Sequence, residues 1–232
     1  MARRRPAATA AAGPRGRLGS ALSWVPPPFI LQLFGFPAAG KLTVAREIAR
    51  LVAERGEDVL VLDNHHINNV LFPIVRIGDG VELSPRLVEH VLAVRDRVLA
   101  VVEELAPPQR SFIFTNVLIE DPEDIDRNAL EEMARLAERT GRGFLAVRLT
   151  CDVEVLAARI AAPDRQARMK WMDADGVRRF ARSATLLQVQ CLELDTTDAA
   201  PNEVARVIVG ELDRLREEPG PAIRPESKRY PG

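Results

Sequence analysis

The sequence predicts an α/β protein in which helices cover both faces of a parallel β-sheet. Short apolar runs alternate along the chain with segments whose apolar residues recur at helical spacing, which is typical of βαβ units with right-handed crossovers. The composition is 47% apolar and only 5% aromatic, as in helix-rich α/β proteins. The length of 232 residues fits one domain with tails.

Five apolar runs are the predicted strands. The first ends at a glycine, and the second ends at an aspartate after four apolar residues. Ligands of such sheets bind beyond the carboxyl ends of the strands, so the segments that follow the runs are where we look for function. The predicted strands cover residues 29–35, 58–63, 111–118, 143–151 and 188–197.

Helical patterns follow the predicted strands. Ser84 is a good N-cap and Pro85 suits the first turn, so a helix is expected from there to Leu105. Asp121-Pro122 is expected to cap another helix, which ends at about Arg139. The other helices are expected at residues 41–56, 153–161 and 201–215.

The two ends differ in composition from the rest. Residues 1–28 are rich in Arg, Ala, Pro and Gly, and residues 218–232 are rich in Pro and charge. We interpret both as disordered tails around a domain at 29–217. For the first tail, a wrongly assigned start codon and a transit peptide are the alternatives.

The segment GFPAAGKLT, after the first predicted strand, nearly matches the phosphate-binding loop (Walker A) pattern G-x-x-x-x-G-K-[ST]. Gly35 would allow the tight turn, Gly40 would let the backbone approach phosphate oxygens, and Lys41 would bind the β- and γ-phosphates. The alternative is a glycine-rich turn that binds nothing. The candidate nucleotide-binding residues are Gly35, Phe36, Pro37, Ala38, Ala39, Gly40, Lys41, Leu42 and Thr43.

One position departs from this pattern. Leu42 stands where a hydroxyl usually binds Mg²⁺, and a threonine follows at Thr43. The predicted metal-binding residues are therefore Thr43 and Asp63, the latter through water.

Asp63 is the first polar residue after the second predicted strand and is a candidate catalytic base for an attacking hydroxyl. The alternative is a helix cap. The polar segment that follows, NHHINN, suits contacts with a polar acceptor molecule. Metal binding by His65 and His66 is disfavoured because adjacent side chains diverge.

A basic segment follows the fourth predicted strand and helix. Arg159, Arg165, Arg168 and Lys170 surround Pro163-Asp164, so residues 163–172 are a candidate lid in which Arg165 and Arg168 offset charge on phosphates during transfer. The alternative is a solvated helix face.

Two other strand ends carry weaker signals. Thr115 and Asn116 stand at the expected end of the third strand, where an acidic residue often helps to hold Mg²⁺. Thr196 and Thr197 are expected at the adenine end by position alone.

Charge and cysteine content limit the partners. The net charge is −1, and no aromatic residues are interleaved with basic ones, so no nucleic-acid partner is expected. No apolar run could span a membrane. The two cysteines form no CxxC motif and suit a reducing, cytoplasmic location.

The chain resembles the P-loop small-molecule kinases, a group that includes shikimate kinase, gluconate kinase, chloramphenicol phosphotransferase and uncharacterised AAA-type ATPase-like kinases. The resemblance covers about residues 29–215 and depends on GFPAAGKLT, Asp63, the basic segment and LELDTTDAAPNEVA. It implies a three-layer P-loop NTPase fold with strand order 2-3-1-4-5, ATP and Mg²⁺ as cofactors, and a monomer or homodimer. It leaves the acceptor unnamed.

Three functions are consistent with this pattern. The first is an ATP-dependent kinase that phosphorylates a hydroxyl of a small molecule. The second is a kinase that acts on a nucleotide or a nucleic-acid end. The third is a nucleotide-binding module without transfer activity, which Leu42 favours.

Overall fold

The structure is a computed structural model that describes residues 26–77, 84–160 and 173–217. Within these ranges five strands form one parallel sheet: β1 (Phe29–Phe34), β2 (Val59–Asp63), β3 (Ser111–Asn116), β4 (Gly143–Thr150) and β5 (Leu192–Asp195). The strand order is β2-β3-β1-β4-β5. The predicted fold class and strand order are therefore confirmed.

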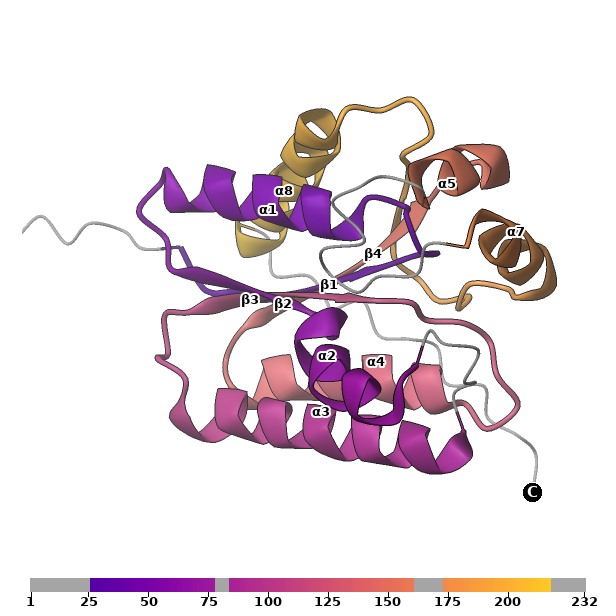
Figure 1. Cartoon of the computed structure of the whole chain (residues 1–232). Helices are drawn as coiled ribbons and strands as arrows, with labels where there is room; N and C mark the ends of the chain where they lie inside the picture. Colours follow the sequence, from indigo (N-terminus) through magenta and orange to yellow (C-terminus); the bar gives the residue numbers. More distant parts are fainter. Residues whose placement is uncertain (1–25, 78–83, 161–172, 218–232) are drawn as a thin grey trace, which may run out of the picture.

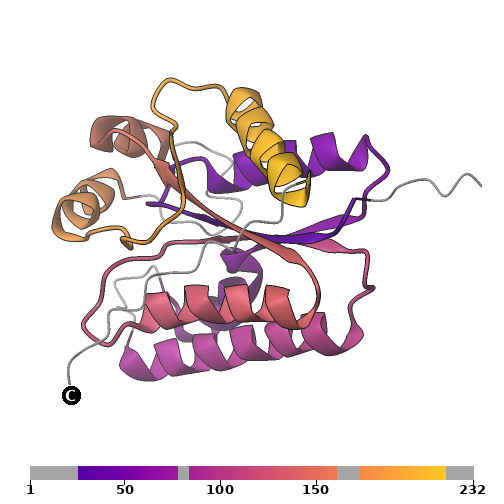
Figure 2. The same ribbon diagram turned by 180° about the vertical axis from the view of Figure 1, so that it is seen from behind.

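Helices cover both faces of the sheet (Figure 1). Their bounds are α1 (Lys41–Ala53), α2 (Asn64–Val75), α3 (Pro85–Leu105), α4 (Ile125–Arg139), α5 (Val153–Ile160), α7 (Ala174–Ser183) and α8 (Pro201–Glu217). Figure 2, seen from behind, shows α1 and α8 on one side of the sheet and α3 and α4 on the other. None of the helices that the structure describes is long and apolar enough to cross a bilayer.

β1 is the central strand and all six of its residues are buried. Its alternating side chains contribute to two cores, because successive residues of a strand point to opposite faces. Leu31 and Leu33 belong to the core beneath α1 and α8. Ile30 and Phe34 belong to the core beneath α3 and α4. The carboxyl end of β1 is therefore held firmly from both faces.

The start of α3 is the one predicted. Ser84 is its N-cap and accepts a hydrogen bond from the Leu87 amide at 3.2 Å, and Pro85 occupies the first turn. The helix predicted after Asp121-Pro122 is α4, which begins at Ile125 and ends at Arg139. Asp121 nevertheless accepts hydrogen bonds from the amides of Ile125 and Asp126, at 3.0 and 3.2 Å. It serves as a cap from one turn upstream.

Two helices were given no bounds by the sequence analysis. The segment after Asp63 forms α2, and Asp63 is its N-cap, as the alternative interpretation of this residue proposed. α2 contains Pro73 and no buried residue, so its local sequence signal is weak. α7 contains Gly176 and three arginines, and it buries only Gly176 and Val177. In α7 the packing on the core outweighs the local propensity, whereas α2 buries no residue and begins after its cap Asp63.

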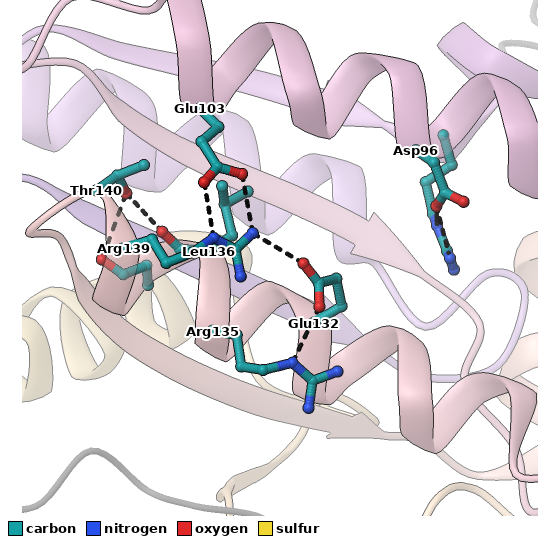
Figure 3. A network of polar contacts seen from close by, with 9 residues as sticks. Asp96, Glu103, Glu132, Arg135, Leu136, Arg139 and Thr140 are labelled. Atoms are coloured by element: carbon teal, nitrogen blue, oxygen red, sulfur yellow. Dashed lines mark hydrogen bonds and ion pairs between the residues drawn. The ribbon is translucent and has the colours of Figure 1, made fainter.

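α3 and α4 are also joined by an ion-pair network (Figure 3). Arg139 donates two hydrogen bonds to Glu103, at 2.7 and 2.9 Å, and one to Glu132 at 2.9 Å. The hydrogen bonds from Arg139 lower the pKa of the Glu103 carboxyl. The network lies at the C-terminal end of α4, close to the start of β4, and therefore at the opposite end of the sheet from the candidate site.

Candidate functional site

The phosphate loop joins β1 to α1 and is shaped by backbone conformations that favour glycine. Gly40, the N-cap of α1, is left-handed with φ 86°. Ala38 also has a positive φ, 67°. Gly35 lies against β4, and a Cβ on it would be 2.3 Å from the Leu149 carbonyl oxygen. The glycines at both ends of the motif are therefore required by geometry.

Lys41 is the first residue of α1, and its ammonium group folds back over the loop. Its Nζ donates hydrogen bonds to the carbonyl oxygens of Gly35 and Phe36, each at 2.8 Å. A cation is thus held beside the loop backbone and the N-terminus of α1. Backbone amides at a helix start and a lysine charge together form a favourable environment for an anion.

The loop is supported from the last third of the chain. Thr196 follows β5, is 3% exposed, and its Oγ1 lies 3.1 Å from the Ala39 carbonyl oxygen and 2.9 Å from that of Thr150. The ring of Phe36 meets that of Phe180 on α7 edge to face, with centroids 5.7 Å apart. Thr196, which was expected at the adenine end, thus holds the loop backbone.

Asp63 ends β2 at the carboxyl edge of the sheet, where it was predicted, and is 4% exposed. Its Oδ1 accepts a hydrogen bond from the His65 amide at 3.0 Å and lies 2.9 Å from His65 Nδ1. Asp63 is therefore the N-cap of α2, as the helix-cap alternative predicted. Capping leaves a role in chemistry open, because the carboxylate still lies at the edge where ligands of such sheets bind.

The candidate metal-binding residues lie on two elements. Leu42 is half-buried in the first turn of α1 and offers no oxygen, and Thr43 beside it is exposed. Within the described ranges, no group of three or more His, Cys, Asp or Glu side chains could hold a metal ion.

The predicted lid, residues 163–172 with Arg165 and Arg168, lies outside the described residues. Arg159 precedes it on α5 and is fixed in place. Its Nη2 donates to the carbonyl oxygens of Thr196 and Thr197, at 2.7 and 3.0 Å. Arg159 therefore supports the segment that in turn holds the loop.

Sequence reasoning missed one side chain near the site, Gln32 on β1. It is 2% exposed, and its Nε2 donates to Asn116 Oδ1 at 3.1 Å. The signal that could have found it is a single polar residue in the apolar run FILQLF. Asn116 ends β3 between the ends of β2 and β1, as expected.

The sequence matches no protein-family model and no curated protein. Solved structures match in fold. The APS kinase CysC of Mycobacterium tuberculosis, solved with AMPPNP and APS, matches with a TM-score of 0.56 at 17% identity, over 81% of this chain and 99% of that one. Kti12 of Chaetomium thermophilum, solved with ADP-AlF3, matches with a TM-score of 0.53 at 13% identity, over 84% and 98%.

A gluconokinase of Sinorhizobium meliloti 1021 also matches, with a TM-score of 0.50 at 18% identity, over 82% of this chain and 94% of that one. Identities this low show the fold alone. The match confirms the resemblance expected from the phosphate-loop motif at the level of architecture. The chain therefore has the fold of the P-loop kinases.

Proposed function

We propose that this protein is an ATP-dependent kinase that transfers the γ-phosphoryl group to a hydroxyl of a small molecule. The observation that carries the proposal is the position of Lys41, whose Nζ lies 2.8 Å from the carbonyl oxygens of Gly35 and Phe36 in the loop between β1 and α1. The P-loop kinase fold supports the same assignment.

The loop and Lys41 would hold the triphosphate. At Gly40 an added Cβ would meet nothing within 4 Å, so this side of the loop is open to a ligand. Backbone amides at the start of α1 face an anion bound there, and the helix dipole favours its negative charge. Lys41 exchanges its two carbonyl partners for the β- and γ-phosphate oxygens.

Asp63 would act on the acceptor. An oxygen–phosphorus bond forms between the acceptor hydroxyl and the γ-phosphorus, and the bond from that phosphorus to the β–γ bridging oxygen breaks. The hydroxyl proton passes to the Asp63 carboxylate, and ADP leaves with the bridging oxygen. His65, 2.9 Å from the Asp63 carboxylate, keeps that side chain in one orientation.

The side chains at this edge fit magnesium bound with ATP. Magnesium is commonly held by one or two carboxylates, waters and substrate phosphates, so Asp63 acting through water suffices without an oxygen at Leu42. Thr43, which is exposed, supplies the hydroxyl of the first turn of α1. When bound, magnesium neutralises charge that develops on the phosphates.

Two alternatives share the phosphate loop with this proposal: one has no acceptor, and the other has a different class of acceptor. Leu42, which lacks the usual hydroxyl, favours a nucleotide-binding module that transfers nothing. A nucleotide or nucleic-acid-end kinase shares the same loop, but the net charge of −1 gives a nucleic acid little attraction.

ADP release from magnesium-ATP tests the proposal, with gluconate, shikimate, chloramphenicol and adenosine 5′-phosphosulfate as acceptors. We expect gluconate, shikimate or chloramphenicol to raise release above the rate in water, whereas release with adenosine 5′-phosphosulfate alone would favour the nucleotide-kinase alternative. Lys41→Ala should weaken ATP binding about 10- to 100-fold, because it removes a charged hydrogen bond. Arg46→Ala, at an exposed position of the same helix, is the control. Unchanged ATP affinity in Lys41→Ala would contradict the proposal.

A further inference from the structure

Gln32 is a buried polar side chain in the middle of the central strand. It is 2% exposed, and the residues two positions away on the same face, Ile30 and Phe34, belong to the core beneath α3 and α4. A buried carboxamide is costly unless its hydrogen bonds are made, so an apolar residue would serve packing better. Its presence indicates a task other than packing.

The contacts of Gln32 determine which way its carboxamide faces. Its Nε2 donates to the Leu33 carbonyl oxygen and to Asn116 Oδ1, both at 3.1 Å. A backbone carbonyl only accepts, so the amide nitrogen of Gln32 must lie on this side. Asn116 must then present its oxygen to Gln32. Its own Nδ2, with two N–H donors, is left on the side away from Gln32.

Asn116 occupies a central position at the carboxyl edge. It is the last residue of β3, and β3 lies between β2 and β1. Its register partner on β1 is Phe34, which directly precedes the phosphate loop. Its neighbour Thr115 is the register partner of Asp63. The half-buried Asn116 therefore stands between the proposed base and the proposed phosphate site.

The face that Asn116 occupies distinguishes it from the loop. Register partners in a parallel pair share a face, so Asn116 lies on the face of Phe34, which is covered by α3 and α4. Lys41 and the loop lead into α1 on the opposite face (Figure 1). The Asn116 amide thus reaches the carboxyl edge from the face opposite α1, whereas Asp63, the register partner of Thr115, reaches it from the face of α1. An acceptor bound over this edge would lie between the two side chains.

We propose that Gln32 positions the Asn116 carboxamide so that its N–H groups bind an oxygen of the acceptor molecule next to the hydroxyl that is phosphorylated. The substrate class is then a molecule with a second oxygen close to the reacting hydroxyl, such as a polyol or a hydroxy acid. This inference rests on the proposed kinase function and specifies how that site selects its acceptor.

Three variants test the inference in the full chain. Asn116→Asp keeps the shape but replaces the N–H donors with a charged acceptor of hydrogen bonds. Gln32→Met keeps the volume and removes the group that orients Asn116. Asn128→Asp makes the same amide-to-carboxylate change at an exposed position of α4 and is the control. The probes are magnesium-ATP with gluconate, shikimate, chloramphenicol or adenosine 5′-phosphosulfate.

With the best of these acceptors, we expect Asn116→Asp to raise the acceptor KM about 10-fold or more. The substitution removes an N–H donor and places a negatively charged carboxylate beside the acceptor oxygen. Gln32→Met should raise the same KM less. The KM for ATP should rise less than the acceptor KM in both variants, and Asn128→Asp should keep the acceptor KM of the parent. If Gln32 and Asn116 were purely structural, their variants would instead lower the unfolding temperature and impair the kinetics with ATP and with the acceptor together.

Two results would overturn the inference, and they are distinguishable. If the parent shows acceptor-dependent ADP release and Asn116→Asp keeps the parent's acceptor KM, the Asn116 role is wrong while the kinase function stands. If none of the four acceptors raises ADP release above the rate in water, the proposed function fails, and the inference fails with it.

Discussion

Gly35 lies so close to β4 that a Cβ on it would be 2.3 Å from the Leu149 carbonyl oxygen. No flexible side chain can yield there, because the neighbour is backbone in a buried strand. Gly35→Ala should therefore push the loop away from β4, lower stability by about 1–3 kcal/mol and abolish ATP binding. Thermal denaturation and ATP titration measure both effects.

Gly40→Ala is the matched comparison. An added Cβ at Gly40 would meet nothing within 4 Å, so only the φ of 86° is unfavourable. A left-handed alanine costs about 1–2 kcal/mol. If Gly35→Ala proves as stable as the parent, or binds ATP as well, the close approach to β4 is not what shapes the loop.

Asp63→Asn separates capping from chemistry. Asparagine caps helices as well as aspartate does, and its oxygen can still accept from the His65 amide. The unfolding temperature should therefore change little, while turnover falls about 10²- to 10⁴-fold because the proposed base is lost. ATP affinity should be nearly unchanged. Full turnover in this variant would leave Asp63 as a cap alone.

Leu42→Ser tests how magnesium is held. The serine would supply the hydroxyl that this position lacks, so the magnesium concentration for half-maximal ADP release should fall. Thr43→Ala should weaken ATP binding, because the exposed Thr43 supplies the hydroxyl of the first turn of α1, beside the phosphate loop. An unchanged magnesium requirement in Leu42→Ser would show that the metal is not bound from this position.

Phe180→Ala tests the contact between α7 and the phosphate loop. The edge-to-face pair with Phe36 has centroids 5.7 Å apart, and such pairs contribute about 0.5–1.5 kcal/mol beyond their burial. Losing it should loosen the loop and raise the Kd for ATP several-fold, with Phe180→Leu showing a smaller effect. Equal ATP affinity in both variants and the parent would argue against this support.

Asp126 gives a stability change with a defined pH dependence. Burial raises the pKa of its carboxyl, against the opposing effect of a hydrogen bond from the Ile119 amide. Because the pKa is higher in the folded state, the contribution of Asp126 to the free energy of unfolding is fully present below the pKa of the unfolded state, about 3.9. It is lost as the pH rises through the pKa of the folded state.

Asp126→Asn carries no charge at any pH, and its oxygen can still accept from Ile119. The unfolding temperature of this variant relative to the parent should therefore rise between pH 3.5 and pH 7. Thermal unfolding across this interval measures the difference. A constant difference, or one that falls with pH, would show that the burial of Asp126 does not control its ionisation.

The sheet and the phosphate loop could be predicted because their signals are local. A buried parallel strand is a continuous apolar run, and Gly35, Gly40 and Lys41 have fixed spacing. α2 and α7 could not be predicted in the same way. α2 buries no residue, and α7 places only a short apolar stripe, Ala174, Val177 and Ala181, on the core.

The candidate site likewise contains residues that a local pattern predicts and residues whose roles depend on distant contacts. Lys41 and Asp63 follow strands, and the sequence places them at the correct edge. The role of Thr196 depends on a hydrogen bond to Ala39 across 157 positions, which no local pattern encodes. Gln32 could have been noticed as a polar residue in an apolar strand, but its partner Asn116 lies 84 positions away.

The bond from Thr196 to the Ala39 carbonyl also has a consequence for synthesis of the protein. A chain emerging from the ribosome makes the phosphate loop early, but its support from residue 196 arrives only when most of the chain has been translated. Domains fold as units during synthesis. The loop therefore reaches its final shape late, and a nascent chain that stops before β5 should gain no protection from proteolysis when ATP is added.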